Sequence, residues 1–249
     1  MIQYMQAVIL AAGRGERLRP LTDTNPKCLT LVGGKTILEY ELDALDAAGI
    51  KECTIVVGYR ANQVIEHYGP SFKNLTLHYV RNPDFATTNN LYSLWLARDR
   101  LQSQTILIEG DLLFYSELIS RLVNLPGTDI AVVDKFQEGM NGTIVRGHGP
   151  MISEFVLKSA QGESFDFSGV AKTVNLYKFS KLTMIEHFLP ALSRYVGEQN
   201  TNIFYEAVLA ELVSKKSLQM GMMFPGDCPW FEIDTTEDLR AAQELFYAP

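Results

Sequence analysis

Short apolar runs alternate with helical patterns through the first half of the chain. Strand-like runs occupy residues 6–11, 53–57, 75–80 and 105–108, and helical patterns occupy residues 36–48, 62–68 and 90–101. In the first helical pattern Leu38, Leu42 and Leu45 share one face, which predicts a helix packed on a sheet. Strands that alternate with helices in this way predict β-α-β units, a mainly parallel sheet and the α/β fold class.

The pattern changes after Pro126. Residues 129–133 form a further strand-like run and residues 139–149 are rich in glycine. The runs at residues 152–157 and 173–179 are close enough in sequence to pair antiparallel. We therefore expect a smaller β elaboration on the same domain.

The last segment has the pattern of a capped helix. Thr235 and Asp238 form a capping box, and Leu239, Ala242 and residues 245–246 continue as an apolar stripe. Since no repeat or linker separates the parts of the chain, we predict a single domain over residues 1–249, with two halves that meet near residue 125.

Composition and charge narrow the class of protein. The 249 residues are 47% hydrophobic and 20% charged, which is typical of a soluble globular domain. The net charge of -7 excludes a general basic footprint for nucleic acid or an anionic membrane, so any bound anion needs a local basic cluster. Three widely spaced cysteines and an N-terminus without a basic signal region predict reduced thiols and a cytoplasmic location.

The strongest local signal follows the first strand, in the segment A-A-G-R-G-E-R-L-R-P-L-T at residues 11–22. Glycines directly after a buried strand let the backbone wrap closely around a phosphate, with successive N–H groups as donors. Residues 13–27 contain four basic and two acidic side chains, a local charge of +2. This segment predicts a triphosphate-binding loop, and a solvated basic turn is the alternative.

Spacing separates this loop from two other nucleotide motifs. Leu18 stands where a dinucleotide fingerprint needs its third small residue. Leu29 stands where a P-loop ending at residues 34–36 needs its first glycine. Neither motif is therefore present.

Carboxylates end two predicted strands. Glu109 and Asp111 follow the strand at residues 106–108, and ligands of open α/β sheets lie at such strand ends. Glu232 and Asp234 share one side of a late strand, although Asp234 could instead cap the following helix. Because Mg²⁺ prefers one or two carboxylates together with substrate phosphates, Asp111 suits a magnesium site.

Two asparagines begin the helix at residue 90. Asn89, Asn90 and Ser93 offer amides and a hydroxyl that can bind a base edge or a ribose. Helix capping accounts for one of the two asparagines. The four histidines lack zinc-ligand spacing and the sequence has no G-x-S-x-G motif, so zinc and serine hydrolases are not supported.

These motifs together resemble the nucleotidylyltransferase superfamily: L-A-A-G-x-G-x-R-L-x-P-L-T at residues 10–22, N-P-K-C-L at 25–29, E-G-D at 109–111 and F-E-I-D at 231–234. More narrowly, V-G-Y at 57–59, Phe85 before N-N-L-Y-S-L at 89–94, and G-V at 169–170 before N-L-Y at 175–177 resemble bacterial CTP-dependent cytidylyltransferases that activate phosphocholine or 2-aminoethylphosphonate. The resemblance implies a Rossmann-like α/β/α fold with a mixed, mainly parallel sheet, similar to nucleotide-diphospho-sugar transferases. Residues 1–125 would be the nucleotide-binding half, and residues 126–249 the acceptor-side half with the C-terminal helix.

The resemblance also implies site residues by position. The nucleotide site would consist of Leu10, Ala11, Ala12, Gly13, Gly15, Arg17, Lys27, Tyr59, Asn89, Asn90, Ser93 and Glu109. Arg17 and Lys27 would be the catalytic cations, and Asp111 with Asp234 would bind Mg²⁺. Relatives carry D-x-D or S-x-D where this chain has E-G-D, so Asp111 keeps the metal role and Glu109 does not.

The implied reaction joins CTP to a small phosphate or phosphonate. An acceptor phosphate carries a charge of roughly -1.5 to -2 at neutral pH, so it attacks the α-phosphorus without a catalytic base. Lys172 is the candidate clamp on the acceptor phosphate, and Tyr177, Tyr205, Glu206 and Trp230 are candidates for a cationic head group. An exposed lysine at a strand end is the alternative for Lys172, and packing in the core or at the rim is the alternative for the four head-group candidates.

Other functions stay open from the sequence. The first alternative is a sugar-1-phosphate nucleotidylyltransferase, which shares the loop and the carboxylates. A metal-dependent glycosyltransferase and a nucleotide-sensing module without catalysis are more distant alternatives. The acceptor and the oligomeric state, with a homodimer as one candidate, are not decided by these motifs.

Overall fold

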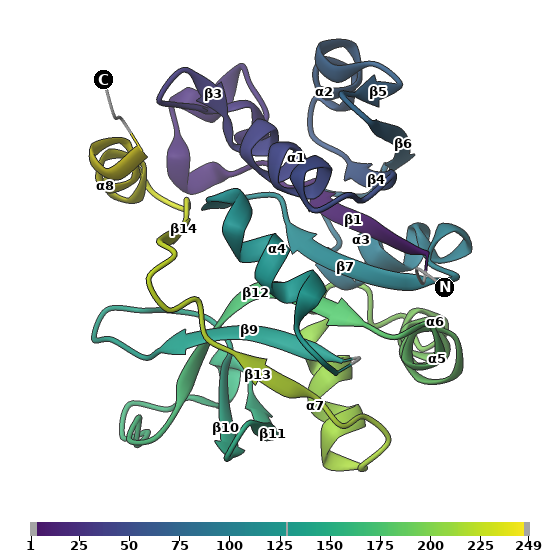
Figure 1. Cartoon of the computed structure of the whole chain (residues 1–249), viewed down its shortest axis with the longest axis vertical. Helices are drawn as coiled ribbons and strands as arrows, with labels where there is room; N and C mark the ends of the chain where they lie inside the picture. Colours follow the sequence, from purple (N-terminus) through teal and green to yellow (C-terminus); the bar gives the residue numbers. More distant parts are fainter. Residues whose placement is uncertain (1–3, 128, 247–249) are drawn as a thin grey trace.

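Four adjacent parallel strands from the first half form one part of a ten-stranded sheet in the computed structural model, which describes residues 4–127 and 129–246 (Figure 1). They are β1 (Met5–Ala11), β4 (Glu52–Val57), β6 (Leu75–Arg81) and β7 (Gln104–Glu109). Strand β1 lies between β4 and β7, and β6 pairs with the far side of β4. The carboxyl ends of these strands therefore meet at one edge of the sheet.

The second half extends the sheet with antiparallel pairings. Its strands are β9 (Ile130–Lys135), β10 (Ile144–His148), β11 (Met151–Val156), β12 (Ala171–Phe179) and β13 (Gly221–Met223). The full order is β10-β11-β13-β9-β12-β7-β1-β4-β6-β5, with β5 at Ser71–Phe72. Strand β12 joins the two halves, because it pairs antiparallel with both β7 and β9. Strand β13 pairs parallel with β9, so the second half contains parallel as well as antiparallel pairs, and the sheet is mixed as the sequence predicts.

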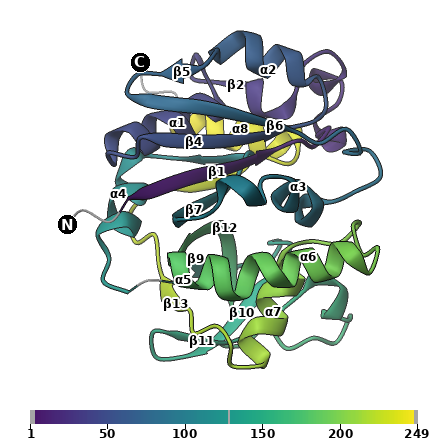
Figure 2. The ribbon, with the colours of Figure 1, turned by 90° about the vertical axis from the view of Figure 1, so that its right-hand side faces the viewer.

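Helices cover both faces of this sheet. One face carries α1 (Ile37–Ala47), α2 (Ala61–Tyr68) and α4 (Ser116–Asn124), packed through leucines such as Leu42 and Leu118. The other face carries α3 (Asn90–Leu96), α6 (Leu189–Gly197) and α7 (Glu206–Ser214), and α3 and α6 lie side by side (Figure 2). This α/β/α arrangement confirms the predicted fold class.

Smaller elements complete the molecule. Short strands β2 (Leu31–Val32) and β3 (Lys35–Thr36) form a hairpin, and β8 (Leu112–Phe114) pairs with β14 (Trp230–Glu232). Helix α8 (Thr236–Phe246) packs on this region, and α5 (Lys181–Thr183) leads through a π-helical turn into α6. Among the described residues, none of the helices has the length and apolar character needed to cross a bilayer.

Several local predictions need correction. The runs at residues 152–157 and 173–179 do not pair with each other. The first pairs with β10, which lies inside the glycine-rich segment that was not predicted as a strand, and the second pairs with β7 and β9. The helix predicted over residues 90–101 ends at Leu96, because the amide of Ala97 donates to Leu94 and Trp95 and the chain tightens into a 3₁₀ turn. The single-domain prediction extends to residues 1–3, 128 and 247–249, which lie outside the described residues.

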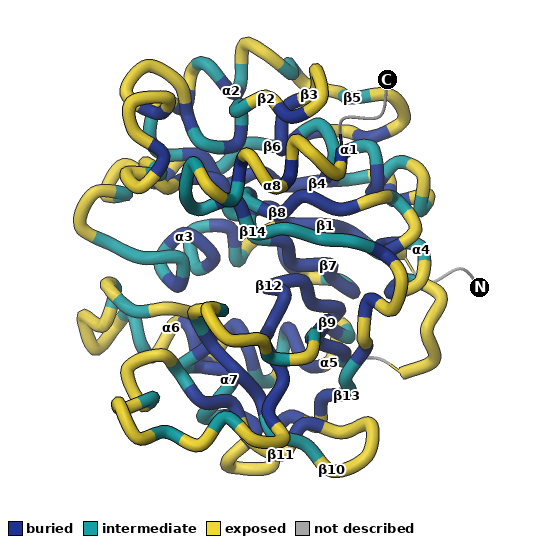
Figure 3. Tube along the Cα trace, turned by 90° about the vertical axis from the view of Figure 1, so that its left-hand side faces the viewer, coloured by how far each residue is buried: buried dark blue, intermediate teal, exposed yellow. Residues whose placement is uncertain are grey.

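The central strands β12, β1 and β7 are deeply buried. Every residue of β12 is buried, and β1 and β7 are buried over most of their length (Figure 3). Exposed positions are concentrated in the loops. A side chain at a strand end thus stands on a rigid, closely packed support.

Gly58 lies where the turn after β4 touches the loop after β1. A Cβ atom at this position would lie 2.6 Å from the carbonyl oxygen of Ala12 and 2.7 Å from Cβ of Phe85. The next amide, that of Tyr59, donates to the same Ala12 oxygen at 3.0 Å. Only glycine lets these two turns approach so closely.

We expect Gly58→Ala to destabilise the fold by about 1–3 kcal/mol, since the new methyl group must displace backbone atoms. Gly162→Ala is the matched control, because nothing lies within 4 Å of its Cβ position, and its effect should stay within about 1 kcal/mol. Urea denaturation of both variants measures the difference. Equal midpoints would show that the two turns do not depend on this contact.

Candidate active site

A cavity of about 470 Å³ opens at the carboxyl ends of β1 and β7, beside the start of α3. The predicted nucleotide and metal residues that line it are Leu10, Ala11, Ala12, Gly13, Gly15, Arg17, Lys27, Asn89, Asn90, Ser93, Glu109, Asp111 and Asp234. Lining residues that the sequence did not single out as site residues include Cys28, Asn82, Phe85, Thr88, Phe204 and Glu232. The strand-end rule used for Asp111 would also have found Asn82, which directly follows β6.

The glycine loop has a fixed shape. Gly15 adopts a left-handed conformation with φ of 65°, and the Thr22 hydroxyl donates to its carbonyl oxygen at 2.8 Å. A Cβ atom on Gly15 would lie 2.9 Å from Cβ of Lys27. The glycine is therefore needed for two reasons: it allows the turn, and it leaves room for the Lys27 stem.

Lys27 holds together two carboxylates from distant parts of the chain. Its Nζ atom lies 2.8 Å from Oδ2 of Asp111 and 2.8 Å from Oδ1 of Asp234. Burial alone would lower the pKa of Lys27, but the two carboxylates raise it above its ordinary value, so the ammonium stays charged. Arg17 also contacts Asp234, with Nη2 at 2.8 Å from Oδ1.

The sequence left two roles for Asp234, a metal ligand or a helix cap, and the structure gives the cap to other residues. Its carboxylate faces Lys27 and Arg17, whose charges outweigh burial and hold its pKa below the usual range. The helix cap is made instead by Thr235 and Asp238: the Thr235 amide donates to Asp238 Oδ2 at 2.7 Å, and the Asp238 amide donates to Thr235 Oγ1 at 3.2 Å. The capping box is thus confirmed, and Asp234 is free for the cavity.

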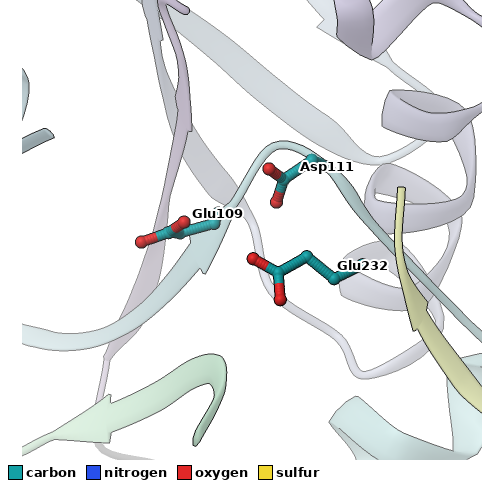
Figure 4. Close-up of side chains that lie close together, drawn as sticks. All are labelled: Glu109, Asp111 and Glu232. Atoms are coloured by element: carbon teal, nitrogen blue, oxygen red, sulfur yellow. The ribbon is translucent and has the colours of Figure 1, made fainter. Parts of the chain in front are cut away.

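A carboxylate cluster lies at the end of β7. Oxygen atoms of Glu109, Asp111 and Glu232 come within 4.8 Å of one another (Figure 4). Oδ1 of Asp111 is buried, and it has no hydrogen-bond partner among the described residues. An unpartnered carboxylate oxygen beside two further carboxylates fits a hard divalent cation, which prefers oxygen ligands.

Burial changes the acidity of this cluster. Burial raises the pKa of Glu232 to about 7; Lys172 opposes the shift, and Asp111 and Asp234 add to it. Burial also raises the pKa of Glu109 well above its ordinary value, with Glu206, Asp111 and Glu232 adding to the effect. Both carboxyl groups therefore hold their protons more strongly than an exposed glutamate does.

The asparagines at the start of α3 form hydrogen bonds within the protein. Asn89 caps the helix by accepting from the Asn90 amide at 2.8 Å. Asn90 donates through Nδ2 to Glu109 at 2.9 Å and accepts from the Tyr205 amide at 2.8 Å. The second asparagine, which capping did not explain, thus ties α3 to β7 and to the start of α7.

Tyr59 contacts the glycine loop and is not among the described residues that line the cavity. Its hydroxyl donates to the carbonyl oxygens of Thr22 and Asp23, at 3.0 and 2.9 Å. Its ring packs edge-on against Phe85. Tyr59 therefore positions the loop rather than facing a ligand.

The predicted acceptor residues do not form an open cage. They are Lys172, Tyr177, Tyr205, Glu206 and Trp230, and the described lining of the cavity contains none of them. Tyr177 and Tyr205 are fully buried and pack edge to face, because the buried strand β12 carries one and the start of α7 covers it with the other. Both tyrosines thus pack in the core, which the sequence left open as their alternative role, and an acceptor-binding role for them stays a prediction.

The other acceptor candidates are also held in place. The indole of Trp230 donates to Asp134 at 2.8 Å. Lys172 is 2% exposed; its ammonium donates to the Thr173 carbonyl oxygen at 2.6 Å and lies 3.4 Å from Glu232. The clamp role of Lys172 on a phosphate stays a prediction.

The chain is similar to known nucleotide transferases. Residues 7–164 match the family described as the MobA-like NTP transferase domain. The chain is 33% identical over 246 residues to the CMP-5'-(3-aminopropyl)phosphonate synthase of Streptomyces rubellomurinus, which covers 98% of this chain and 39% of that protein. It is 29% identical over 259 residues to the CTP:phosphoglutamine cytidylyltransferase of Campylobacter jejuni, which covers 96% of this chain and all of that protein.

Solved structures share the fold. The CTP:phosphocholine cytidylyltransferase of Streptococcus pneumoniae matches with a TM-score of 0.74 and 23% identity, over 98% of this chain and 99% of that one. At this identity the likeness establishes the fold. The chain spans less than half of the length of the Streptomyces relative.

Lys27 and a divalent cation compete for the same carboxylates. We expect Lys27→Met, which keeps the stem and removes the charge, to bind Mn²⁺ about tenfold tighter or more in the absence of nucleotide. Electron paramagnetic resonance of free Mn²⁺ measures the affinity, and Lys181→Met, at an exposed position, is the control. Unchanged Mn²⁺ affinity in Lys27→Met would mean that the ammonium does not occupy the cation position.

Proposed function

Because the chain belongs to the family of MobA-like NTP transferase domains, as the resemblance implied, we propose that it is a cytidylyltransferase that transfers CMP from CTP to a small amino-alcohol phosphate or phosphonate. The observation that carries the proposal is the cavity itself, in which a glycine loop, Lys27 and the carboxylates Asp111 and Asp234 converge. Similarity to cytidylyltransferases over nearly the whole chain supports the nucleotide and the acceptor class.

The reaction needs one bond exchange at phosphorus. An oxygen of the acceptor phosphate or phosphonate attacks the α-phosphorus of CTP in line, and the bond from that phosphorus to the oxygen bridging the β-phosphorus breaks. Pyrophosphate leaves with that oxygen. A phosphate acceptor gives a CDP-linked product, and a phosphonate acceptor gives a CMP-linked product.

The residues of this chain bind and hold the two anions. The loop from Leu10 to Arg17 surrounds the triphosphate, and the side chains of Arg17 and Lys27 supply positive charge. Asp111 and Asp234, with Glu232 beside them, would hold Mg²⁺, which when bound neutralises phosphate charge and stabilises the leaving group. The unpartnered oxygen of Asp111 supports this assignment.

Pyrophosphate release tests the function directly. We expect release with CTP in the presence of phosphoethanolamine, phosphocholine or 2-aminoethylphosphonate, and little release with UTP, dTTP or GTP. Asp111→Asn should lose most of the turnover, whereas the exposed control Asp99→Asn should keep it. Turnover confined to a sugar-1-phosphate would instead favour a sugar nucleotidylyltransferase.

Lys27 should matter more for turnover than for CTP binding, because its charge is needed most as negative charge develops during transfer. We expect Lys27→Ala to lower kcat by about 10²–10³-fold with a small change in the KM for CTP. Lys27→Arg should rescue poorly, since a planar guanidinium does not reproduce the compact ammonium that lies 2.8 Å from both Asp111 and Asp234. A raised KM with an unchanged kcat would show that Lys27 only anchors the triphosphate.

A further inference from the structure

Thr22 lies behind the glycine loop and is not among the described residues that line the cavity. Its side chain is buried, with 1% of the residue exposed. Its hydroxyl donates to the carbonyl oxygen of Gly15 at 2.8 Å, and the same oxygen accepts from the backbone amide of Leu18 at 3.1 Å. The Gly15 carbonyl group therefore cannot turn without losing a hydrogen bond that a buried side chain provides.

The backbone of Gly15 lies against the side chain of Lys27. A Cβ atom on Gly15 would lie 2.9 Å from Cβ, 3.3 Å from Cγ and 3.2 Å from Cδ of Lys27. Three carbons of the lysine stem thus run along the Gly15 turn. Because the packing is this close, a movement of Gly15 changes the space in which the stem lies.

The position of the stem decides where the Lys27 ammonium lies. Its Nζ atom is 2.8 Å from an oxygen of Asp111 and 2.8 Å from an oxygen of Asp234. A shift of the stem lengthens at least one of these two contacts. Misplacement of a catalytic group by about 1 Å can cost on the order of 10²-fold in rate, so the turn that supports the stem matters for the reaction.

The start of α2 holds Thr22 from the other side. The Tyr59 hydroxyl lies 3.0 Å from the carbonyl oxygen of Thr22 and 2.9 Å from that of Asp23. Gln63 donates through Nε2 to the carbonyl oxygen of Thr24 at 3.1 Å. Three successive carbonyl groups are thus fixed to the beginning of a helix, and Thr22 passes this support on to Gly15.

We propose that Thr22 is a positioning residue for Lys27: its hydroxyl holds the Gly15 turn against the lysine stem and so keeps the ammonium between Asp111 and Asp234. The effect on catalysis rests on the proposed function, in which Lys27 stabilises the charge that develops during transfer. Filling of the core is the other role that a buried threonine can have. Valine has nearly the same shape as threonine and lacks the hydroxyl, so it separates the two roles.

Nuclear magnetic resonance of the lysine ammonium groups examines the placement of Lys27 directly. Ammonium protons held by two carboxylates exchange slowly with water, so Lys27 should give a ¹H–¹⁵N signal that Lys27→Met removes. We expect Thr22→Val to raise the exchange rate of these protons about tenfold, and Thr22→Ser, which keeps the hydroxyl, to change it by less than about twofold. Thr24→Val is the matched control, at an exposed threonine of the same segment.

Two results of this measurement would overturn the proposal. One is an exchange rate in Thr22→Val that equals the rate in the wild-type protein. The other is the absence of a Lys27 signal from the wild-type protein, since the ammonium would then not be held in place.

Steady-state kinetics separates the positioning of Lys27 from a general loosening of the loop. We expect Thr22→Val to lower kcat about 3–10-fold with the KM for CTP changed by less than about twofold, and Thr22→Ser to keep the wild-type values. In the Lys27→Ala background the same change to valine should have little further effect, because the group that Thr22 positions is gone. An equal loss of kcat in both backgrounds, or a raised KM with an unchanged kcat, would contradict the proposal.

Tyr59→Phe examines the same series of contacts if Thr22→Val does not fold. It removes the hydroxyl that holds the Thr22 carbonyl group and leaves the Thr22 hydroxyl in place, so the exchange rate of the Lys27 ammonium should rise about 2–3-fold. Tyr115→Phe, at a tyrosine that is 39% exposed, is its control. Equal exchange rates in Tyr59→Phe and the wild-type protein would then decide against the proposal.

Failure of the proposed function gives a different result. If no acceptor releases pyrophosphate from CTP, the proposed cytidylyl transfer is wrong. The exchange measurements need neither nucleotide nor acceptor, so they still decide whether Thr22 positions Lys27.

Discussion

The ion pairs of Lys27 with Asp111 and Asp234 organise the whole site. They connect a loop after β1, the end of β7 and the segment before α8, which are separated by 84 and 207 positions in the chain. A single ammonium between two partly buried carboxylates satisfies charges that would otherwise be expensive to bury. The same arrangement places the Lys27 ammonium at the carboxylates that are proposed to hold a metal ion, so on that proposal metal binding and the position of Lys27 are coupled.

The sheet makes this convergence possible. Strands β1 and β7 are parallel neighbours, so the glycine loop and Asp111 leave the sheet at the same edge. Strand β14 pairs antiparallel with β8 directly after Asp111, and this pairing brings Glu232 and then Asp234 to the same place. Gly110 fits between these segments because a Cβ atom there would lie 2.9 Å from Cβ of Ala11. Close approach of backbones therefore sets the positions of the charges.

The sequence predicted the parts of the site that depend on local patterns. In any α/β sheet, a glycine loop after a buried strand and a carboxylate at a strand end lie at the edge where ligands bind. Gly15, Lys27 and Asp111 were therefore placed at the cavity from the sequence alone. Tyr177 and Tyr205 were not, because the direction of their side chains depends on which strands flank β12 and on where α7 packs. Strand β10 was missed for a similar reason: its pairing partners, not its glycine-rich composition, make it a strand.

Charge balance links the metal and the nucleotide. Glu109, Asp111, Glu232 and Asp234 are four acidic groups that line the cavity, and Lys27 and Arg17 line it with positive charge. A nucleoside triphosphate adds further negative charge to the same space. Such a site binds its anionic substrate together with cations from outside the protein, and the buried oxygen of Asp111 that lacks a hydrogen-bond partner among the described residues offers a ligand to one of them.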